Sequence, residues 1–358
     1  MRKMSLKKAL FFLTLVLALA ACGAPAEEAG PVVASCDADG MFDGSAYAKE
    51  PPYTICFSNA SVANAWRVAM VANFDYGIEE AKAAGLVDNY YYADANADSA
   101  KQIADIEDLL TRGCDVMLIS ANTADVVDPG AKKAMEAGVP VITLDRDVAS
   151  PENRVSFTDG DSCAMGTVGA EWLAEELGGE GDVVLLSGVA GASPAEERLR
   201  CARETFAKYP GITELAQAYT EWSPASGQAQ MEAWLTQFGG DAIDGVWSDS
   251  ALQGVGVLEA YNAAGVQVPP TTGEDWALWM RMAYESGAPF LAISFPNRMS
   301  YFSVQDALAM LQGEKIQCHH QIAPFQLTRD NLSEYWSPET SDELWLDMLP
   351  AVLADWGK

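Results

Sequence analysis

Charged side chains stand directly behind short apolar segments at several points of this sequence. Asp145 and Arg146 follow the segment VITL, Asp249 and Ser250 close VWSDS, and Asp275 closes TTGED. Carboxylates and guanidinium groups form strong, charge-assisted hydrogen bonds. The pattern therefore predicts a site that brackets vicinal hydroxyl groups, as the rim of a sugar presents them.

Aromatic and further basic residues accompany these groups. Asn64, Trp66 and Arg67 follow the first apolar segment of the folded chain, Arg198 ends GVAGASPAEER, and Trp222 stands in AYTEWSPASG. An indole ring offers a large apolar face that can cover the C–H face of a sugar. These residues extend the expected binding site beyond its charged groups.

Each of these side chains also has a purely structural interpretation. Trp66 could be the first core residue of its helix, and Trp222 could be a buried plug in a loop. Asp145 and Arg146 could form a surface ion pair, and Arg198 could pair with Glu196 or Glu197 on its own helix face. The sequence leaves these alternatives open.

Enzymatic and metal-binding interpretations find little support. The chain contains no GxSxG, Walker or GxGxxG motif. Asp145 and Asp275 resemble a glycosidase carboxylate pair in type, but neighbouring arginines keep such carboxylates ionised and unsuited to general acid work. His319 and His320, in CHHQ, are expected beyond the sheet-forming region, and adjacent residues on a strand point to opposite faces. We therefore predict no catalytic residue, cofactor or metal.

Short apolar segments alternate with amphipathic helical patterns along the chain. This alternation predicts parallel sheets covered by helices, whose ligands bind at the carboxyl ends of the strands. The predicted strands are 53–58, 90–93, 116–120, 139–144, 183–187, 245–248 and 290–294. The predicted helices are 66–84, 99–112, 163–177, 195–209, 225–238, 252–264 and 299–311.

The segments VPVITLDR and GVAGASPAEER, in this order and at this distance, resemble the type I periplasmic binding proteins of the ribose, galactose and galactofuranose group. The likeness extends over about 53–313. It implies an α/β fold of two doubly wound parallel-sheet lobes joined by three hinge crossovers, near 159–161, 295–296 and 324–327. The first lobe would comprise 53–160 and 296–325, and the second 161–295 and 326–358 with a tail.

The resemblance also implies a role for each site residue. Asn64, Arg67, Asp145 and Arg146 would bind the ligand from the first lobe. Arg198 and Asp275 would do so from the second lobe, near Asp249 and Ser250, and Trp66 and Trp222 would supply stacking faces. The Trp66-Arg67 pair resembles the galactofuranose binders more than the ribose binders.

The implied function is capture of a neutral monosaccharide, either a hexose such as a galactofuranose-like sugar or a pentose. In this family the closed, liganded form docks on the permease of an ABC-type importer, whose separate ATPase drives import. A sensor that presents sugar to a chemoreceptor or a sensor kinase is the alternative. The sequence does not separate these two roles, because both use the same closed lobes.

The start of the chain predicts membrane anchoring. Basic residues precede an apolar run over 9–21, which is too short to span a bilayer and ends in small residues before Cys22. This start resembles a bacterial lipobox, which implies a signal peptide over 1–21 and an acylated Cys22. An ordinary secretory signal is the alternative. The Ala-, Gly-, Pro- and Glu-rich segment 22–52 is expected to be a tether, which places the rest of the chain outside the cytoplasm.

The formal charge of the chain is −29, and removal of four cationic residues with the signal peptide would leave −33. Such an acidic surface repels nucleic acid and anionic lipid. We therefore expect no nucleic-acid partner, and we expect a monomer.

Six cysteines follow Cys22, and an oxidising compartment would permit disulfides between them. Cys163 and Cys201, near the starts of two successive helices, form the preferred pair, although spacing alone does not determine connectivity. Cys56 and Cys114 are interpreted as small buried hydrophobic residues. No CxxC motif is present.

Overall fold

The computed structural model describes residues 35–355. The predicted signal peptide and Cys22 lie outside the described residues. Within the described part, no helix is both long enough and apolar enough to cross a bilayer.

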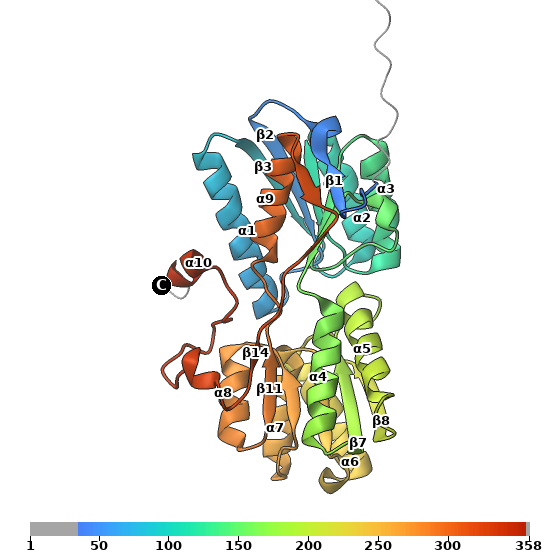
Figure 1. Cartoon of the computed structure of the whole chain (residues 1–358), viewed down its shortest axis with the longest axis vertical. Helices are drawn as coiled ribbons and strands as arrows, with labels where there is room; N and C mark the ends of the chain where they lie inside the picture. Colours follow the sequence, from blue (N-terminus) through green and yellow to red (C-terminus); the bar gives the residue numbers. More distant parts are fainter. Residues whose placement is uncertain (1–34, 356–358) are drawn as a thin grey trace, which may run out of the picture. The chain divides into compact units, whose positions relative to one another are not determined.

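The first lobe, which contains α1, α2, α3 and α9 in Figure 1, is built on a six-stranded parallel sheet. Its strand order is β13-β6-β5-β4-β2-β3. Its strands are β2 (Tyr53–Asn59), β3 (Val87–Asp94), β4 (Val116–Ser120), β5 (Val141–Leu144), β6 (Ser156–Asp159) and β13 (His319–Gln321). Its helices are α1 (Ala65–Ala83), α2 (Ser99–Thr111), α3 (Ala124–Glu136) and α9 (Met299–Leu311). The central strands are buried on both faces, as a helix-covered parallel sheet requires.

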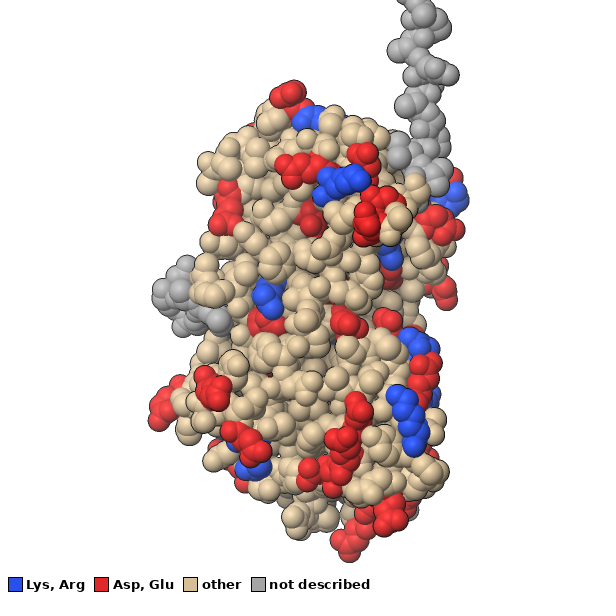
Figure 2. Space-filling view, viewed as in Figure 1, with Lys and Arg blue, Asp and Glu red and all other residues tan. Residues whose placement is uncertain are grey.

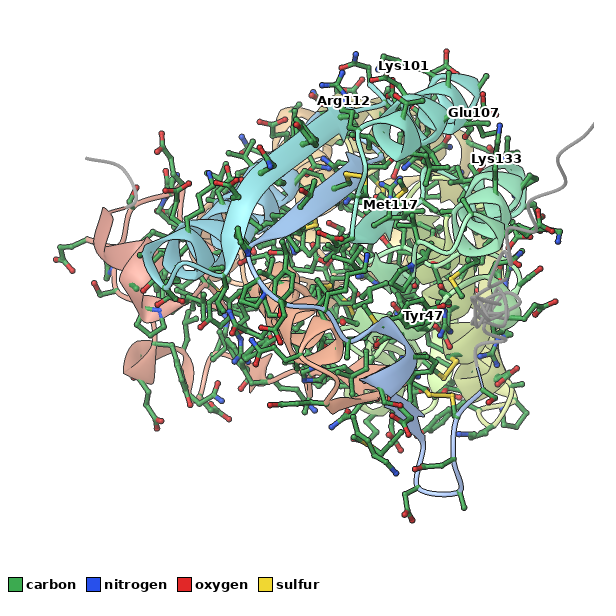
Figure 3. The ribbon with its side chains drawn as sticks, turned by 90° about the horizontal axis from the view of Figure 1, so that it is seen from above. Tyr47, Lys101, Glu107, Arg112, Met117 and Lys133 are labelled. Atoms are coloured by element: carbon green, nitrogen blue, oxygen red, sulfur yellow. A yellow bond between two sulfur atoms is a disulfide. The ribbon has the colours of Figure 1, made fainter. Side chains whose placement is uncertain are left out.

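Helices α2 and α3 pack against each other in this lobe, and a surface ion pair joins them. Lys133 Nζ on α3 lies 2.6 Å from Glu107 Oε1 on α2, above the strand that carries Met117 (Figure 3). Gly130 permits the close approach, because a Cβ atom there would lie 2.9 Å from Ile106 Cδ1.

The second lobe has a six-stranded sheet in the order β14-β11-β10-β9-β7-β8, in which only β14 is antiparallel to its neighbour. Its strands are β7 (Glu180–Ser187), β8 (Gly211–Tyr219), β9 (Gly245–Ser248), β10 (Thr271–Gly273), β11 (Phe290–Ile293) and β14 (Gln326–Leu327). Its helices are α4 (Ser162–Glu176), α5 (Ser193–Phe206), α6 (Pro224–Phe238), α7 (Ala251–Ala264) and α8 (Ala277–Ser286).

The chain passes between the two sheets three times. The connections run from β6 to α4, from β11 to α9, and from β13 to β14. Two parallel-sheet lobes with three crossovers confirm the predicted fold class.

The predicted tether is ordered over part of its length. Residues 41–47 form β1 (Met41–Asp43) and a short 3-10 helix η1 (Gly44–Tyr47), and β1 pairs with β12 (Lys315–Gln317). A disulfide joins Cys36 to Cys318. This segment is therefore bonded to the first lobe instead of forming a free linker.

The cysteine predictions are half correct. The predicted disulfide between Cys163 and Cys201 is present, and it joins α4 to α5. Cys56 and Cys114 also form a disulfide, so their interpretation as free buried residues is wrong. The reason is the strand order: β2 and β4 are neighbours, which brings the two Cα atoms to 5.8 Å.

The two histidines were expected beyond the sheet, but they form its edge strand β13. His319 Nε2 lies 2.9 Å from Asp159 Oδ1, whereas His320 Nδ1 lies 2.8 Å from Asp306 Oδ2. The two rings thus have different partners, as expected for neighbours on a strand. Within residues 35–355, no group of three or more histidine, cysteine or acidic side chains is arranged to hold a metal ion.

The C-terminal tail follows β14 and contacts both lobes. Trp345 is buried and stacks on Trp276, with ring centroids 5.7 Å apart. The backbone N–H of Leu349 donates to Asn73 Oδ1 on α1, at 3.2 Å. The tail, with 3-10 helix η4 (Leu332–Glu334) and helix α10 (Pro350–Asp355), therefore links the second lobe to the first.

Acidic side chains are distributed over the visible face of the folded chain, with basic side chains among them (Figure 2). This distribution agrees with the interpretation of the net charge as a solvated acidic surface.

Candidate functional site

A narrow cavity, of about 30 Å³, lies where the carboxyl ends of strands from both lobes meet. Ligands of open α/β sheets bind at this edge. The lining residues come from both lobes and one crossover: Asn64, Trp66, Arg67, Asp145, Arg146, Pro194, Arg198, Trp222, Ser250, Leu252, Glu274 and Phe295. Eight of the ten predicted ligand-binding residues are among them, and Asp249 and Asp275 are not.

The first-lobe wall is an ion-pair cluster at the ends of β4 and β5. Arg67 Nη2 lies 2.9 Å from Asp145 Oδ2, and Arg67 Nη1 donates to Ser120 Oγ at 2.8 Å. Arg146 Nε lies 3.8 Å from the same Asp145 oxygen. Asn64 caps the start of α1, where its side chain accepts a hydrogen bond from the backbone N–H of Arg67. The Asn64 cap therefore holds the backbone of Arg67 in place, and the ion pair with Asp145 holds its side chain.

Arg146 is not fully compensated by its partners. Its Nη1 donates to the backbone oxygen of Asn122 at 3.2 Å, but its buried Nε has no acceptor within the described part of the chain. Burial, together with the neighbouring Arg67, lowers the pKa of the Arg146 guanidinium. A ligand oxygen placed at Nε would favour its charged form.

The second-lobe wall centres on Arg198 of α5. Its Nη1 donates to the backbone oxygen of Asp249 at 2.7 Å and lies 3.4 Å from Glu274 Oε1. The guanidinium carbon lies 4.0 Å from the centre of the Phe295 ring, within cation–π range. Arg198 Nε is buried and has no acceptor among residues 35–355. Like Arg146, it retains a donor for a ligand.

Trp222 is held rigidly at the cavity. It adopts a left-handed backbone conformation with φ of 49°, and its Nε1 donates to Asp249 Oδ1 at 3.0 Å. A Cβ atom on Gly188 would lie 1.9 Å from the indole, so this packing requires glycine there. The Arg146 guanidinium carbon lies 4.8 Å from the indole centre, which joins the two walls.

Trp66 also joins elements across the cavity. Its Nε1 donates to the backbone oxygen of Phe295 at 2.9 Å, and the two rings are tilted with centroids 5.6 Å apart. Phe295 belongs to the crossover from β11 to α9 and was not predicted as a site residue. The sequence offered one signal for Phe295, because this residue follows the apolar strand β11 and strand ends were expected to form the site.

Asp249 lies behind the cavity wall and positions it. Its Oδ2 accepts from Ser187 Oγ at 2.8 Å and from the Gly188 backbone N–H at 3.2 Å, and its Oδ1 accepts from Trp222 and Gln253. Burial raises the pKa of this carboxyl. Asp249 therefore acts on the cavity through Trp222.

The predicted site residue Asp275 does not line the cavity, and the carboxylate found in the lining after β10 is its neighbour Glu274. Asp275 turns to the tail, where its Oδ2 accepts from the backbone N–H of Asp347 at 2.8 Å. Burial and the adjacent Asp347 raise the pKa of Asp275. Two successive residues after β10 point in different directions, so only one of them reaches the cavity.

Glu274 is tied to its own lobe by one oxygen. Its Oε2 accepts from Ser250 Oγ at 2.5 Å and from the Ala251 backbone N–H at 3.2 Å. Burial raises the pKa of Glu274 to about 7, against the opposing effect of Arg198. Ser250 thus lines the cavity and also orients the carboxylate of Glu274 through its hydroxyl group.

Comparison with known proteins identifies related chains. The family model described as the periplasmic binding protein domain matches residues 55–315. A xylitol-binding protein of Mycolicibacterium smegmatis is 28% identical over 240 residues, which cover 66% of this chain and 68% of that protein. A ribose import binding protein of Escherichia coli is 28% identical over 235 residues, which cover 65% of this chain and 78% of that protein.

A solved structure supports the same relationship. An ABC transporter solute binding protein from Mycobacterium smegmatis, crystallised with bound glycerol, superposes with a TM-score of 0.72 at 25% identity. The superposition covers 81% of this chain and 99% of that protein.

Proposed function

Since this chain belongs to the periplasmic binding protein family, we propose that it is an extracytoplasmic solute-binding lipoprotein that captures a neutral monosaccharide between its two lobes. We propose further that it delivers the sugar to an ABC-type importer. The observation that carries the proposal is the cavity at the strand ends, where buried arginines from both lobes face acidic groups and two tryptophans.

Charge balance supports a neutral ligand. The buried cations Arg67, Arg146 and Arg198 are matched by three buried carboxyl groups, Asp145, Asp249 and Glu274. When these carboxyls are ionised, the site carries no surplus charge that an ionic ligand would neutralise. Two related proteins are named for uncharged ligands, one for the polyol xylitol and one for the sugar ribose.

The Trp66-Arg67 pair favours a hexose, such as a galactofuranose-like sugar, over a pentose. Arg67 adds hydrogen-bond donors in a fixed arrangement at the rim of the cavity. A second aromatic side chain at this position would offer only an apolar face. Arg67 is buried and anchored by Asp145, so its position is defined before a ligand arrives.

A thermal-shift panel of pentoses, hexoses, deoxy sugars, polyols, uronic acids and nucleosides tests the ligand class. A ligand at 100 times its dissociation constant adds about 2.7 kcal/mol to the free energy of unfolding, so a binder raises the melting temperature measurably. Stabilisation by a uronic acid or a nucleoside alone would contradict the neutral-sugar proposal. Stabilisation by ribose alone would contradict the preference for a hexose.

Two further tests address anchoring and delivery. Cys22→Ser should abolish incorporation of labelled lipid, and a variant that still carries labelled lipid would contradict the lipoprotein proposal. Sugar uptake should fail in a strain that lacks this chain. Normal uptake with lost chemotaxis or signalling would favour the sensory alternative.

A further inference from the structure

Two adjacent carboxyl groups, Glu274 and Asp275, follow strand β10, and only the first lines the cavity. We propose that Glu274, and not Asp275, is the carboxylate with which the second lobe binds the ligand, and that it accepts a hydrogen bond from a ligand hydroxyl. This inference rests on the proposed function, because it requires a polyhydroxylated ligand in the cavity.

The two oxygens of Glu274 are used unequally. Oε2 accepts two hydrogen bonds, from Ser250 Oγ and from the Ala251 backbone N–H. Oε1 has only the long contact of 3.4 Å to Arg198 Nη1. A carboxylate oxygen can accept about two hydrogen bonds. Oε1 therefore keeps acceptor capacity, while Oε2 holds the side chain in place.

A donor accompanies this acceptor on the same wall. Arg198 Nε is buried and lacks an acceptor in the described part of the chain. A hydroxyl group donates one hydrogen bond and accepts others, so a single ligand hydroxyl can satisfy Glu274 Oε1 and the Arg198 guanidinium together. Across the cavity, Arg146 Nε offers a second donor. The arrangement is complementary to a ligand with several hydroxyl groups.

Asp275 has a different set of contacts. Its Oδ2 accepts from the Asp347 backbone N–H at 2.8 Å, and its backbone oxygen accepts from the Leu346 N–H at 3.3 Å. Its Oδ1 has no hydrogen-bond partner among residues 35–355, but the side chain is fully buried and is absent from the cavity lining, so this oxygen is not offered to a ligand there. Asp275 therefore fastens the C-terminal tail to the loop that presents Glu274.

The ionised carboxylate of Glu274 can only accept hydrogen bonds, whereas its protonated form can also donate one. Without ligand, burial raises its pKa to about 7. The charged or titratable groups around it are Arg198 and Asp249 on its own wall, Asp275 and Asp347 behind it, and Arg67, Asp145 and Arg146 across the cavity. A ligand hydroxyl that donates to Glu274 favours the ionised form. Affinity should therefore fall as the pH drops below about 7, by up to tenfold per pH unit.

The test compares Glu274→Gln with Asp275→Asn, a matched pair of adjacent amide substitutions. The probe is whichever of D-galactose, D-fructose, D-ribose, xylitol and myo-inositol binds the unmodified chain most tightly by isothermal titration calorimetry. We expect Glu274→Gln to raise the dissociation constant at least 30-fold without lowering the melting temperature. We expect Asp275→Asn to change the dissociation constant less than threefold, because Asp275 does not line the cavity.

The pH profile of the unmodified chain is an independent measurement that needs no variant. We expect weaker binding from pH 8 to pH 5, and a flatter profile in Glu274→Gln. Equal affinity in Glu274→Gln, loss of affinity in Asp275→Asn alone, or weaker binding as the pH rises through 7 would each overturn the Glu274 assignment. Each of those results would leave the proposed function intact. If none of the five probes binds the unmodified chain, the proposed function itself is contradicted, and the assignment fails with it.

Discussion

The carboxylate of the first-lobe wall, Asp145, forms a close ion pair with an arginine, whereas the carboxylate of the second-lobe wall, Glu274, has only a longer contact with its arginine. Asp145 lies 2.9 Å from Arg67 and 3.8 Å from Arg146. Glu274 lies 3.4 Å from Arg198, and burial raises its pKa to about 7. Each wall keeps one buried arginine Nε without an acceptor among residues 35–355, Arg146 in the first wall and Arg198 in the second. The walls differ in the carboxylate, because only that of the first wall is held by a close ion pair. Substitutions in the first wall should act mainly on folding, and those in the second wall mainly on binding.

The largest effect should follow Arg67→Met. Arg67 is buried beside Asp145, and its loss leaves that carboxylate with the more distant Arg146 as its cation and with a hydrogen bond of 3.3 Å from Ser120 Oγ. Breaking one side of a buried ion pair costs about 3–5 kcal/mol of unfolding free energy, measurable by urea denaturation. The control is Arg200→Met, because Arg200 forms an exposed pair with Glu204 on α5 and should contribute less than about 1 kcal/mol.

A loss below about 1 kcal/mol in Arg67→Met, similar to that expected for the control, would show that charge pairing does not organise the first wall. The comparison between the walls would then have no energetic basis.

Arg198→Ala should act on binding. Ligand hydroxyls would lose a charged partner in a closed cavity, which weakens binding by about 2–4 kcal/mol in calorimetry. Folding should survive, because Glu274, with its pKa raised to about 7, can take up a proton when its cation is removed. Arg203→Ala, which removes a surface pair with Glu214, is the control. An Arg198→Ala protein that binds normally, or that fails to fold at neutral pH, would reverse the assignment of roles to the walls.

The first wall was more predictable from sequence than the second. Asp145 and Arg146 end a clearly apolar segment, and Asn64 stands at a helix start, so local pattern alone placed them at the strand ends. Strand β10 has only three residues, which gives no periodicity to assign a direction to Glu274 or Asp275. Their directions depend on Asp347, which lies 72 positions beyond Asp275 in the sequence.

Three other features were not predicted, either because they depend on residues far apart in the sequence or because their local sequence pattern is weak. The Cys56–Cys114 disulfide depends on β2 lying beside β4. Strand β8 is a half-exposed edge strand without a continuous apolar segment. Helix α3 was not among the predicted helices, and it contains Pro129, a residue that normally breaks a helix.

Without ligand, Glu274 should make stability depend on pH. Its pKa in the folded chain, about 7, is above its usual value of 4.5. Its stabilising contribution is therefore complete below pH 4.5 and is lost as the pH rises through about 7, by roughly 3 kcal/mol. The measurement is the difference in unfolding free energy between the unmodified chain and Glu274→Gln from pH 4 to 8. Asp249 and Asp275, whose pKa values are also raised, are present in both proteins, so their effects largely cancel. Parallel curves would show that Glu274 titrates normally.

The smallest effect concerns His320, which lies on the edge strand of the first lobe and outside the cavity lining. Its hydrogen bond to Asp306 raises the pKa of His320 above 6.5. Its stabilising contribution is complete below pH 6.5 and is lost as the pH rises through the raised value. Because the side chain is one quarter exposed, solvent screening limits this contribution to less than about 1 kcal/mol. His320→Gln should flatten the pH dependence above 6.5 and leave the steeper fall between 4.5 and 7 to Glu274. If His320→Gln instead removed that steeper fall, the main titrating group would lie outside the cavity, and the distinction drawn between its two walls would fail.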